Sequence, residues 1–179
     1  MAILRGFTPE RTSELASAAW TAGFHLVEVP LQGPLSARAL QGVSNSGTGV
    51  IGAGSILSTD LVDQAARLGA VFTVSPGFDE KVAAYSLSVG LPHLPGVATP
   101  TEVQRAMSAG FTWLKAFPAA VLGHEWFSAM LGPFPDVRLV ATGGVTSENF
   151  EQLLDAGASA VSFGTSFTSM ETSALERLQ

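Results

Sequence analysis

Residues 99–118 read Thr99-Pro100-Thr101-Glu102-Val103-Gln104-Arg105-Ala106-Met107-Ser108-Ala109-Gly110-Phe111-Thr112-Trp113-Leu114-Lys115-Ala116-Phe117-Pro118. A hydroxyl that can cap a helix, followed by proline and an acid in the first turn, predicts a helix start at Thr99. Gly110 predicts its end, because glycine readily adopts the left-handed conformation that often follows a helix. The apolar run after Gly110 has the length of one strand and suits a strand buried on both faces. These residues therefore predict a helix that leads into a buried parallel strand.

The same order of helix, glycine and apolar run recurs along the whole chain. The glycines at these junctions are separated by 24, 22, 21, 20, 22 and 25 residues and are Gly23, Gly47, Gly69, Gly90, Gly110, Gly132 and Gly157. Further helix starts are expected at Thr8-Pro9-Glu10, Ser58-Thr59-Asp60 and Thr146-Ser147-Glu148. We expect eight strands, near residues 2–5, 25–30, 50–53, 71–74, 91–95, 112–117, 138–142 and 159–163. Eight parallel strand–helix units predict an α/β fold of the (βα)8 TIM-barrel type.

The regular spacing favours this closed barrel over an open doubly wound sheet. An open sheet also alternates strand and helix, but it has no reason to repeat eight times at nearly constant length. The chain has 179 residues and a hydrophobic content of 46%, which suits one core, so we expect a single TIM-barrel domain over residues 1–179. Such barrels usually need about 200 residues or more. The barrel is therefore expected to be compact, with short or missing terminal helices.

The composition excludes several classes of function. The chain contains no cysteine, which excludes disulfides, a thiol nucleophile and cysteine-ligated metals. Its net charge of −6, without a cluster of Lys or Arg, predicts no binding to nucleic acid. No apolar run approaches the roughly 18 residues of a membrane helix, and the first residues lack the apolar region of a signal peptide. We therefore expect no membrane partner and a cytoplasmic location.

Two charged residues stand out within otherwise apolar strands. The active site of a TIM barrel lies at the carboxyl ends of its strands, where Lys115 and Glu28 are expected. Burial would lower the pKa of Lys115 and make its amine a nucleophile that can form an imine. Glu28, in the run Leu26-Val27-Glu28-Val29, could transfer protons beside it. The alternative for Lys115 is a side chain that reaches the barrel mouth and pairs with a carboxylate.

Glycines after the last two predicted strands indicate the kind of ligand. Thr142-Gly143-Gly144 is expected to lead directly into a capped helix, and Gly164-Thr165 to do the same one unit later. Exposed amides at two neighbouring helix starts form the frequent phosphate site of these barrels. Either pair taken alone is also compatible with a tight turn. Together they favour a phosphorylated small-molecule substrate.

With these residues in place, the chain resembles the 2-keto-3-deoxy-6-phosphogluconate and 2-keto-3-deoxy-6-phosphogalactonate aldolases over nearly its whole length. The resemblance rests on Ile3-Leu4-Arg5-Gly6, Val27-Glu28-Val29-Pro30-Leu31, Ile51-Gly52-Ala53-Gly54-Ser55-Ile56-Leu57, Ser75-Pro76-Gly77, Leu94-Pro95-Gly96, Leu114-Lys115-Ala116-Phe117-Pro118-Ala119 and Thr142-Gly143-Gly144-Val145, in this order. It implies a class I aldolase that needs no metal and no cofactor and that forms a homotrimer. The products would be pyruvate and glyceraldehyde 3-phosphate.

The same resemblance implies a role for each site residue. Lys115 would form the Schiff base and Glu28 would move protons. Contacts to the carboxylate and keto end of the substrate would come from Arg5 and Ser55, and the phosphate would be held by Gly143, Gly144, Gly164 and Thr165.

The chain departs from the family pattern in several places. Gln32 stands near a position where the gluconate-specific members tend to carry arginine, while the run Phe117-Pro118-Ala119-Ala120 is closer to the gluconate pattern, so both sugars stay open. Ser55 and Thr165 replace the usual threonine and serine, and each keeps a hydroxyl. Both ends are shorter than in relatives.

The sequence contains other residues of interest and is compatible with other reaction classes. The three histidines, His25, His93 and His124, form no cluster in the sequence, and we expect structural roles for them. For the tryptophans, Trp20, Trp113 and Trp126, we expect packing between helices and barrel. The alternatives to an aldolase are a phosphosugar isomerase or epimerase, which needs no lysine imine, and a non-catalytic barrel that binds a sugar-acid phosphate.

Overall fold

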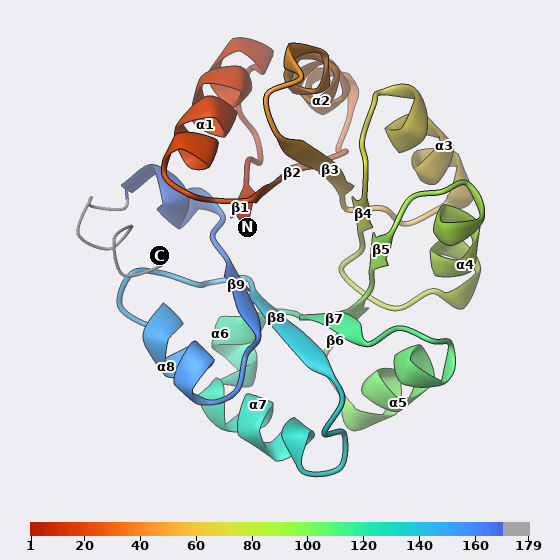
Figure 1. Ribbon diagram of the computed structural model, residues 1–179, viewed down its shortest axis with the longest axis vertical. Helices are drawn as coiled ribbons and strands as arrows, with labels where there is room; N and C mark the ends of the chain where they lie inside the picture. Colours follow the sequence, from red (N-terminus) through yellow and green to blue (C-terminus); the bar gives the residue numbers. More distant parts are fainter. Residues whose placement is uncertain (170–179) are drawn as a thin grey trace.

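The computed structural model describes residues 1–169, and for Thr165 and Ser169 it describes the backbone alone. A ring of strands occupies the centre, and helices surround it on the outside (Figure 1). The strands are β1 Ala2–Ile3, β2 Leu26–Pro30, β3 Val50–Gly54, β4 Thr73–Val74, β5 His93–Leu94, β6 Gly96–Val97, β7 Trp113–Ala116, β8 Arg138–Thr142 and β9 Ala160–Ser162. The helices are α1 Pro9–Thr21, α2 Pro34–Ser46, α3 Thr59–Arg67, α4 Glu80–Ser88, α5 Pro100–Ser108, α6 Ala119–Leu122, α7 His124–Leu131 and α8 Phe150–Asp155, followed by the 3-10 helix η1 Thr165–Ser169.

All strand pairs are parallel and follow the order of the chain. One run pairs β1 through β5 and the other pairs β6 through β9. The ring joins at one side through a parallel bridge between Ala2 and Phe163, with the amide of Ile3 donating to the carbonyl of Phe163 at 2.7 Å. At the other side, the amide of Lys115 donates to the carbonyl of Pro95 at 2.8 Å. The predicted TIM-barrel fold is confirmed.

The fifth predicted strand differs from the expectation. It was expected as one strand at residues 91–95, but it is divided into β5 and β6 on either side of Pro95. Proline has no amide hydrogen and cannot continue the ladder as a donor. Residues before Pro95 therefore pair with β4, and residues after it pair with β7.

Most helix ends follow the local chemistry read from the sequence. Thr8, Ser58 and Thr99 each cap a helix, and Thr99 forms a capping box with Glu102. The expected glycines after helices have positive φ at Gly23, Gly47, Gly69, Gly90, Gly110 and Gly157. Gly132 does not follow this pattern, because it follows α7 with φ of −60°.

The expected helix start at Thr146-Ser147-Glu148 is realised only in part. The Thr146 hydroxyl accepts from the amide of Glu148 at 3.3 Å, but these residues form a turn ahead of the helix. Helix α8 begins only at Phe150 and has six residues, and its cap residue Asn149 makes no side-chain capping bond. The Asn149 side chain instead accepts from the amide of Thr146 at 2.9 Å, which holds residues 146–149 in a turn. Of the terminal helices, η1 has five residues, and residues 170–179 lie outside the described part of the chain.

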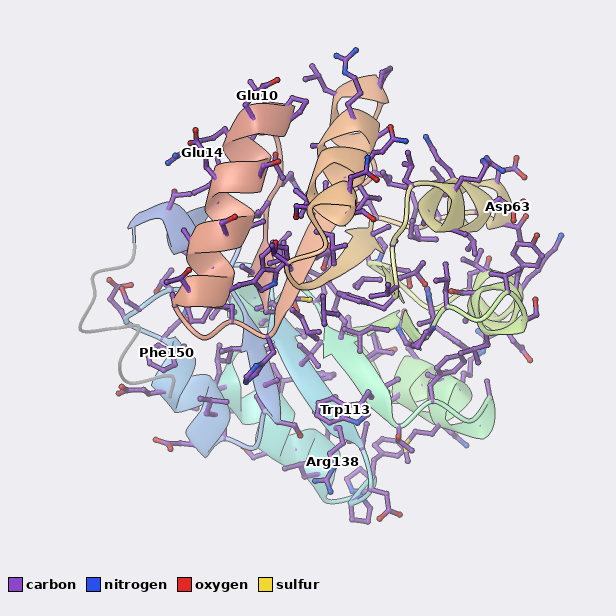
Figure 2. The ribbon with its side chains drawn as sticks, turned by 45° about the horizontal axis from the view of Figure 1, so that its top comes forward. Glu10, Glu14, Asp63, Trp113, Arg138 and Phe150 are labelled. Carbon is purple, nitrogen blue, oxygen red and sulfur yellow. The ribbon has the colours of Figure 1, made fainter. Side chains whose placement is uncertain are left out.

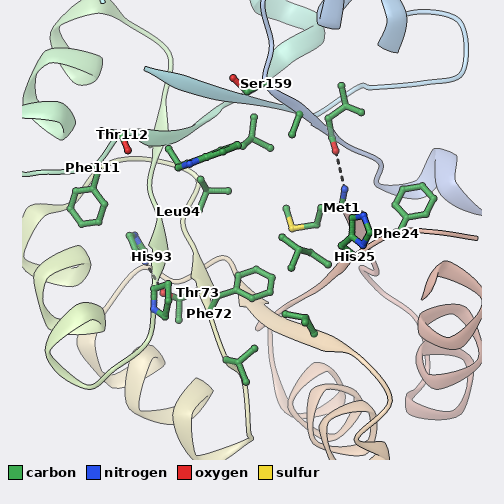
Figure 3. A pocket seen from close by; sticks show the side chains of 18 of the residues that line it. Met1, Phe24, His25, Phe72, Thr73, His93, Leu94, Phe111, Thr112 and Ser159 are labelled. Atoms are coloured by element: carbon green, nitrogen blue, oxygen red, sulfur yellow. Dashed lines mark hydrogen bonds between the residues drawn. The ribbon is translucent and has the colours of Figure 1, made fainter. Parts of the chain in front are cut away.

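A cavity of about 1010 Å³ opens at the amino-terminal ends of the strands (Figure 3). Its lining includes His25, Leu26, Val50 and Trp113, which stand just before or at the start of β2, β3 and β7. Trp113 is 49% exposed there, so the expected packing between helix and barrel is wrong for this residue. Figure 2 shows Trp113 near Arg138, its register partner at the start of β8.

Acidic residues of helices α1 and α3 face outward. Figure 2 shows Glu10 and Glu14 of α1 and Asp63 of α3 on the outside of the molecule. Trp20 and Trp126 pack partly buried against the core, as expected. Within residues 1–169, no helix is both long and apolar enough to cross a lipid bilayer.

Candidate active site

Lys115 and Glu28 meet inside the barrel. They lie on β7 and β2, which are not neighbours, and their side chains approach across the interior. The Lys115 Nζ atom is 4.0 Å from Glu28 Oε2, and the side chains are only 4% and 0% exposed. The sequence predicted both residues at the site, and the fold brings them together.

The Lys115–Glu28 pair is buried away from solvent. Neither carboxylate oxygen of Glu28 has a hydrogen-bond partner among residues 1–169. Burial raises the pKa of Glu28, although the positive charges of Lys115 and Arg5 oppose this shift. Burial also lowers the pKa of Lys115, with the carboxylate of Glu28 opposing and Arg5 adding to the shift. Both shifts favour the neutral forms, so the site favours an amine with a free electron pair and a carboxyl group that can exchange a proton.

Two glycines of β3 provide space for neighbouring side chains. A Cβ atom added to Gly54 would collide with the Glu28 carboxylate, and one added to Gly52 would collide with the Phe72 ring. Gly52 and Gly54 were not predicted from the sequence as site residues in their own right. A glycine within a strand often marks a close approach by another group, and this signal could have identified them.

Phe117 is a further neighbour of the lysine that the sequence analysis did not single out. Its ring centroid lies 5.3 Å from Lys115 Nζ. The ring also packs close to Gly143, where an added Cβ would come within 2.9 Å of it. Phe117 therefore lies close both to the amine and to the loop that follows β8.

Arg5 and Ser55 follow the carboxyl ends of β1 and β3, the two strands on either side of β2, as expected. Arg5 follows β1 by two positions and is exposed, yet its charge acts on both Glu28 and Lys115. Ser55 directly follows β3 and is half-buried. Its φ of 58° is unusual for a residue with a side chain, and such strained positions are frequent at functional sites.

The glycines expected to bind phosphate lie in two loops that a side chain links. Gly143 and Gly144 have φ of 92° and 72°, which other residues rarely adopt. The Ser166 hydroxyl donates to the carbonyl of Val145 at 2.6 Å and so joins the loop after β9 to the loop after β8. A Cβ added to Gly164 would meet no atom within 4 Å.

One part of the expectation for these loops is wrong. The residues Thr142-Gly143-Gly144 do not lead directly into a capped helix, because α8 starts only at Phe150. Gly164 leads into the 3-10 helix η1 rather than an α-helix, and the side chain of Thr165 lies outside what the structure describes.

The histidines remain apart in the described structure. His25 lines the cavity at the far end of the barrel. His124 lies at the start of α7, 3.3 Å from Glu125 Oε2 and 3.3 Å from Gln152 Nε2. His93 is buried in the barrel wall between Thr73 and Ser75. No histidine reaches the Lys115–Glu28 pair by a direct contact that the structure records.

Comparisons with known proteins agree on one family. A family model described as KDPG and KHG aldolase matches residues 1–178. The 2-dehydro-3-deoxy-6-phosphogalactonate aldolase of Escherichia coli strain K12 is 35% identical over 167 residues, which cover 92% of this chain and 82% of the relative. The 2-dehydro-3-deoxy-phosphogluconate aldolase of Treponema pallidum is 38% identical over 140 residues, which cover 77% of this chain and 67% of the relative.

A solved structure gives the same result at the level of the fold. The KDPG aldolase of Legionella pneumophila, crystallised with pyruvate captured at low pH as a covalent carbinolamine, aligns with a TM-score of 0.85 at 28% identity. The alignment covers 99% of this chain and 91% of that one.

Proposed function

We propose, because the chain belongs to the KDPG and KHG aldolase family, that it is a class I aldolase that cleaves a 2-keto-3-deoxy-6-phospho sugar acid. The substrate would be of the phosphogluconate or phosphogalactonate type, and the products pyruvate and glyceraldehyde 3-phosphate. The observation that carries this proposal is the buried pair of Lys115 and Glu28, whose charged forms are both disfavoured by burial.

The proposed reaction uses these two side chains in turn. The Lys115 amine adds to the keto carbon, and the neutral Glu28 carboxyl group donates its proton to the hydroxyl that leaves as water. This step gives a protonated imine that can accept electrons and leaves Glu28 as a carboxylate. The carboxylate of Glu28 takes the proton of the hydroxyl on carbon four, the bond between carbons three and four breaks, and its electrons pass into the imine as an enamine. Glyceraldehyde 3-phosphate leaves. The enamine then receives a proton at carbon three, and water hydrolyses the resulting imine to release pyruvate and the free lysine.

The surrounding residues would orient the substrate. Arg5 supplies a positive charge for the substrate carboxylate at the end of β1, and Ser55 supplies a hydroxyl close to the keto end. Gly143, Gly144, Gly164 and Thr165 would hold the phosphate in the two loops joined by Ser166. The positive φ values and the open space at Gly164 support this part of the proposal.

Borohydride reduction in the presence of pyruvate tests the imine directly. We expect the intact mass to rise by one reduced pyruvate adduct, and peptide mapping to place the adduct on Lys115. Lys115→Ala should abolish the adduct, while Lys81→Ala serves as the control and should keep it, because Lys81 is exposed on α4. A folded protein without an adduct, or with an adduct only on Lys81, contradicts the proposal and favours an isomerase or a binding barrel.

The proposal also includes an oligomeric state and a cellular location. We propose a homotrimer and a cytoplasmic location, on the basis of the family resemblance. Exposed large apolar residues such as Leu57 and Val121, at 65% and 81% exposure, are compatible with an interface between copies. Light scattering after size-exclusion chromatography should give three times the mass of 18.5 kDa, and a monomer would contradict the assembly without affecting the imine test.

A further inference from the structure

His93 lies in a chain of hydrogen bonds inside the barrel wall. Its Nδ1 atom is 2.7 Å from Thr73 Oγ1, and its Nε2 atom is 3.1 Å from Ser75 Oγ. The side chain is 8% exposed, and Figure 3 shows it beside Thr73 at the edge of the cavity. Thr73 in turn is 2.6 Å from Ser86 Oγ on helix α4. A polar chain of this kind is costly in an apolar wall unless its members are paired.

The position of the His93 ring hydrogen follows from the hydrogen-bond partners of Ser75. Ser75 has one hydroxyl hydrogen and donates it to the carbonyl of Gly77 at 2.6 Å. Ser75 therefore accepts from His93, so Nε2 carries the ring hydrogen. Burial lowers the pKa of His93 to about 4, so the ring is neutral at pH 7 and its single ring hydrogen is on Nε2. The two ring nitrogens thus have different partners and different roles.

From Ser75, the path of hydrogen bonds continues to the backbone of Lys115. The Gly77 carbonyl also accepts from the amide of Gly96 at 3.3 Å. Gly96 is the register partner of Lys115, and the Lys115 amide donates to the carbonyl of Pro95 at 2.8 Å. A Cβ atom added to Gly96 would collide with Pro76, so the loop of residues 75–77 lies directly on this part of the wall. The path from His93 to Lys115 is continuous.

We propose that His93 is a positioning residue that, through Ser75 and the Gly77 carbonyl, fixes the β5–β6 junction and so the direction in which Lys115 enters the barrel. This role rests on the proposed imine chemistry of Lys115. The junction needs such support because the strand pairing changes at Pro95, which lacks an amide donor. A displacement of the nucleophile by about 1 Å is sufficient to cost about 10²-fold in rate.

Four variants separate this role from simple packing. His93→Gln places an amide nitrogen near the position of Nε2 and can still donate to Ser75. His93→Asn is shorter and can replace only the Nδ1 side. Ser75→Ala removes the link to Gly77. Ser86→Ala breaks the hydroxyl chain on the other side of Thr73 and is the matched control, because Ser86 has no part in the path to Lys115.

The measurements are kcat and KM for cleavage, the rate of borohydride trapping with pyruvate, and the thermal unfolding midpoint. We expect Ser75→Ala and His93→Asn to lower kcat and the trapping rate by about ten- to a hundredfold with KM nearly unchanged. Arg5 and the phosphate glycines follow other strands, β1, β8 and β9, and should bind as before. His93→Gln should restore most of the rate, and Ser86→Ala should keep the wild-type rate even if its unfolding midpoint falls.

Three results would overturn the role. One is a wild-type kcat in both His93→Asn and Ser75→Ala. The second is a loss in Ser86→Ala as large as that in Ser75→Ala at temperatures where both are folded. The third is a failure of His93→Gln to recover more rate than His93→Asn. A wild-type protein that forms no pyruvate adduct would overturn the proposed function together with this role, whereas an adduct in the wild type with unaffected variants overturns only the role of His93.

Discussion

At the scale of single residues, the space beside the Glu28 carboxylate is set by a residue without a side chain. Glu28 is fully buried, and its Oε1 atom would collide with the Cβ of any larger residue at position 54. Gly54 pairs with Pro30 on the neighbouring strand β2, so neither backbone can move away easily. The position of the carboxylate thus depends on Gly54 as much as on Glu28 itself.

We expect Gly54→Ala to displace the Glu28 carboxylate and to lower kcat for aldol cleavage by about 10²-fold or more, since proton transfer by a positioned group contributes about 10² to 10⁴ in rate. Steady-state kinetics with detection of pyruvate measures this loss. Gly42→Ala is the matched control, because it lies in helix α2 with its nearest contact at 3.8 Å. The control should keep full activity and gain about 0.5–1 kcal/mol in stability. Equal activity in both variants would contradict the steric argument.

At the scale of elements, helix α5 shows how local chemistry defines a boundary. The Thr99 hydroxyl accepts from the amide of Glu102 at 3.3 Å, and the Glu102 carboxylate accepts from the amides of Thr99 and Ala98 at 3.0 and 2.8 Å. These bonds satisfy amides that the helix itself leaves free. Since all the partners lie within five residues, the start of α5 needs no tertiary contact.

We expect Thr99→Ala to lower the free energy of unfolding by about 1 kcal/mol. Urea denaturation should show this as a lower midpoint with an unchanged slope. Ser147→Ala provides the comparison, because Ser147 was expected to start a helix but lies in the turn before α8 and bonds only to its neighbour Glu148. Its effect should stay within about 0.5 kcal/mol. A larger loss for Ser147→Ala than for Thr99→Ala would contradict this account of the two segments.

At the scale of the whole molecule, the barrel separates two environments along its axis. The amino-terminal ends of the strands surround the cavity of about 1010 Å³. Lys115 and Glu28 lie farther along the strands, toward the carboxyl ends where Arg5 and Ser55 follow. Between the two ends, buried titratable groups in the interior and the wall link the stability of the whole fold to pH.

His93 predicts part of this pH dependence. Its pKa is lowered from 6.5 to about 4 by burial, so the unfolded chain binds a proton more readily than the folded one between these values. The contribution of His93 should therefore be fully present above about pH 6.5 and should be lost as the pH falls toward 4. At about 1.4 kcal/mol per pH unit, the loss amounts to about 3 kcal/mol.

The free energy of unfolding of the wild type and of His93→Gln, measured by urea denaturation from pH 7 to pH 4, tests this dependence. The raised pKa of Glu28 acts with the opposite sign, since its contribution is lost as the pH rises above about 4.5. It is common to both proteins and cancels in their difference. The wild type should lose stability relative to the variant as the pH falls, and a constant difference would show that His93 does not titrate in this way.

The sequence by itself determined most boundaries and the order of the elements. Caps at Thr8, Ser58 and Thr99 and the positive-φ glycines act through atoms a few residues away, so a local pattern is sufficient to predict them. The constant spacing of these signals also predicted eight strand–helix units. Lys115 and Glu28 were identified because charged residues in apolar strands are costly and therefore informative.

Only the tertiary structure decided how distant residues meet. The approach of Lys115 to Glu28 across the interior, the collision that keeps position 54 a glycine, and the path from His93 to Lys115 all join separate strands. The change of pairing at Pro95 depends on which strands supply hydrogen-bond partners on either side of it. Local propensity acts over a few residues, whereas these features arise when the barrel closes and brings remote backbones together.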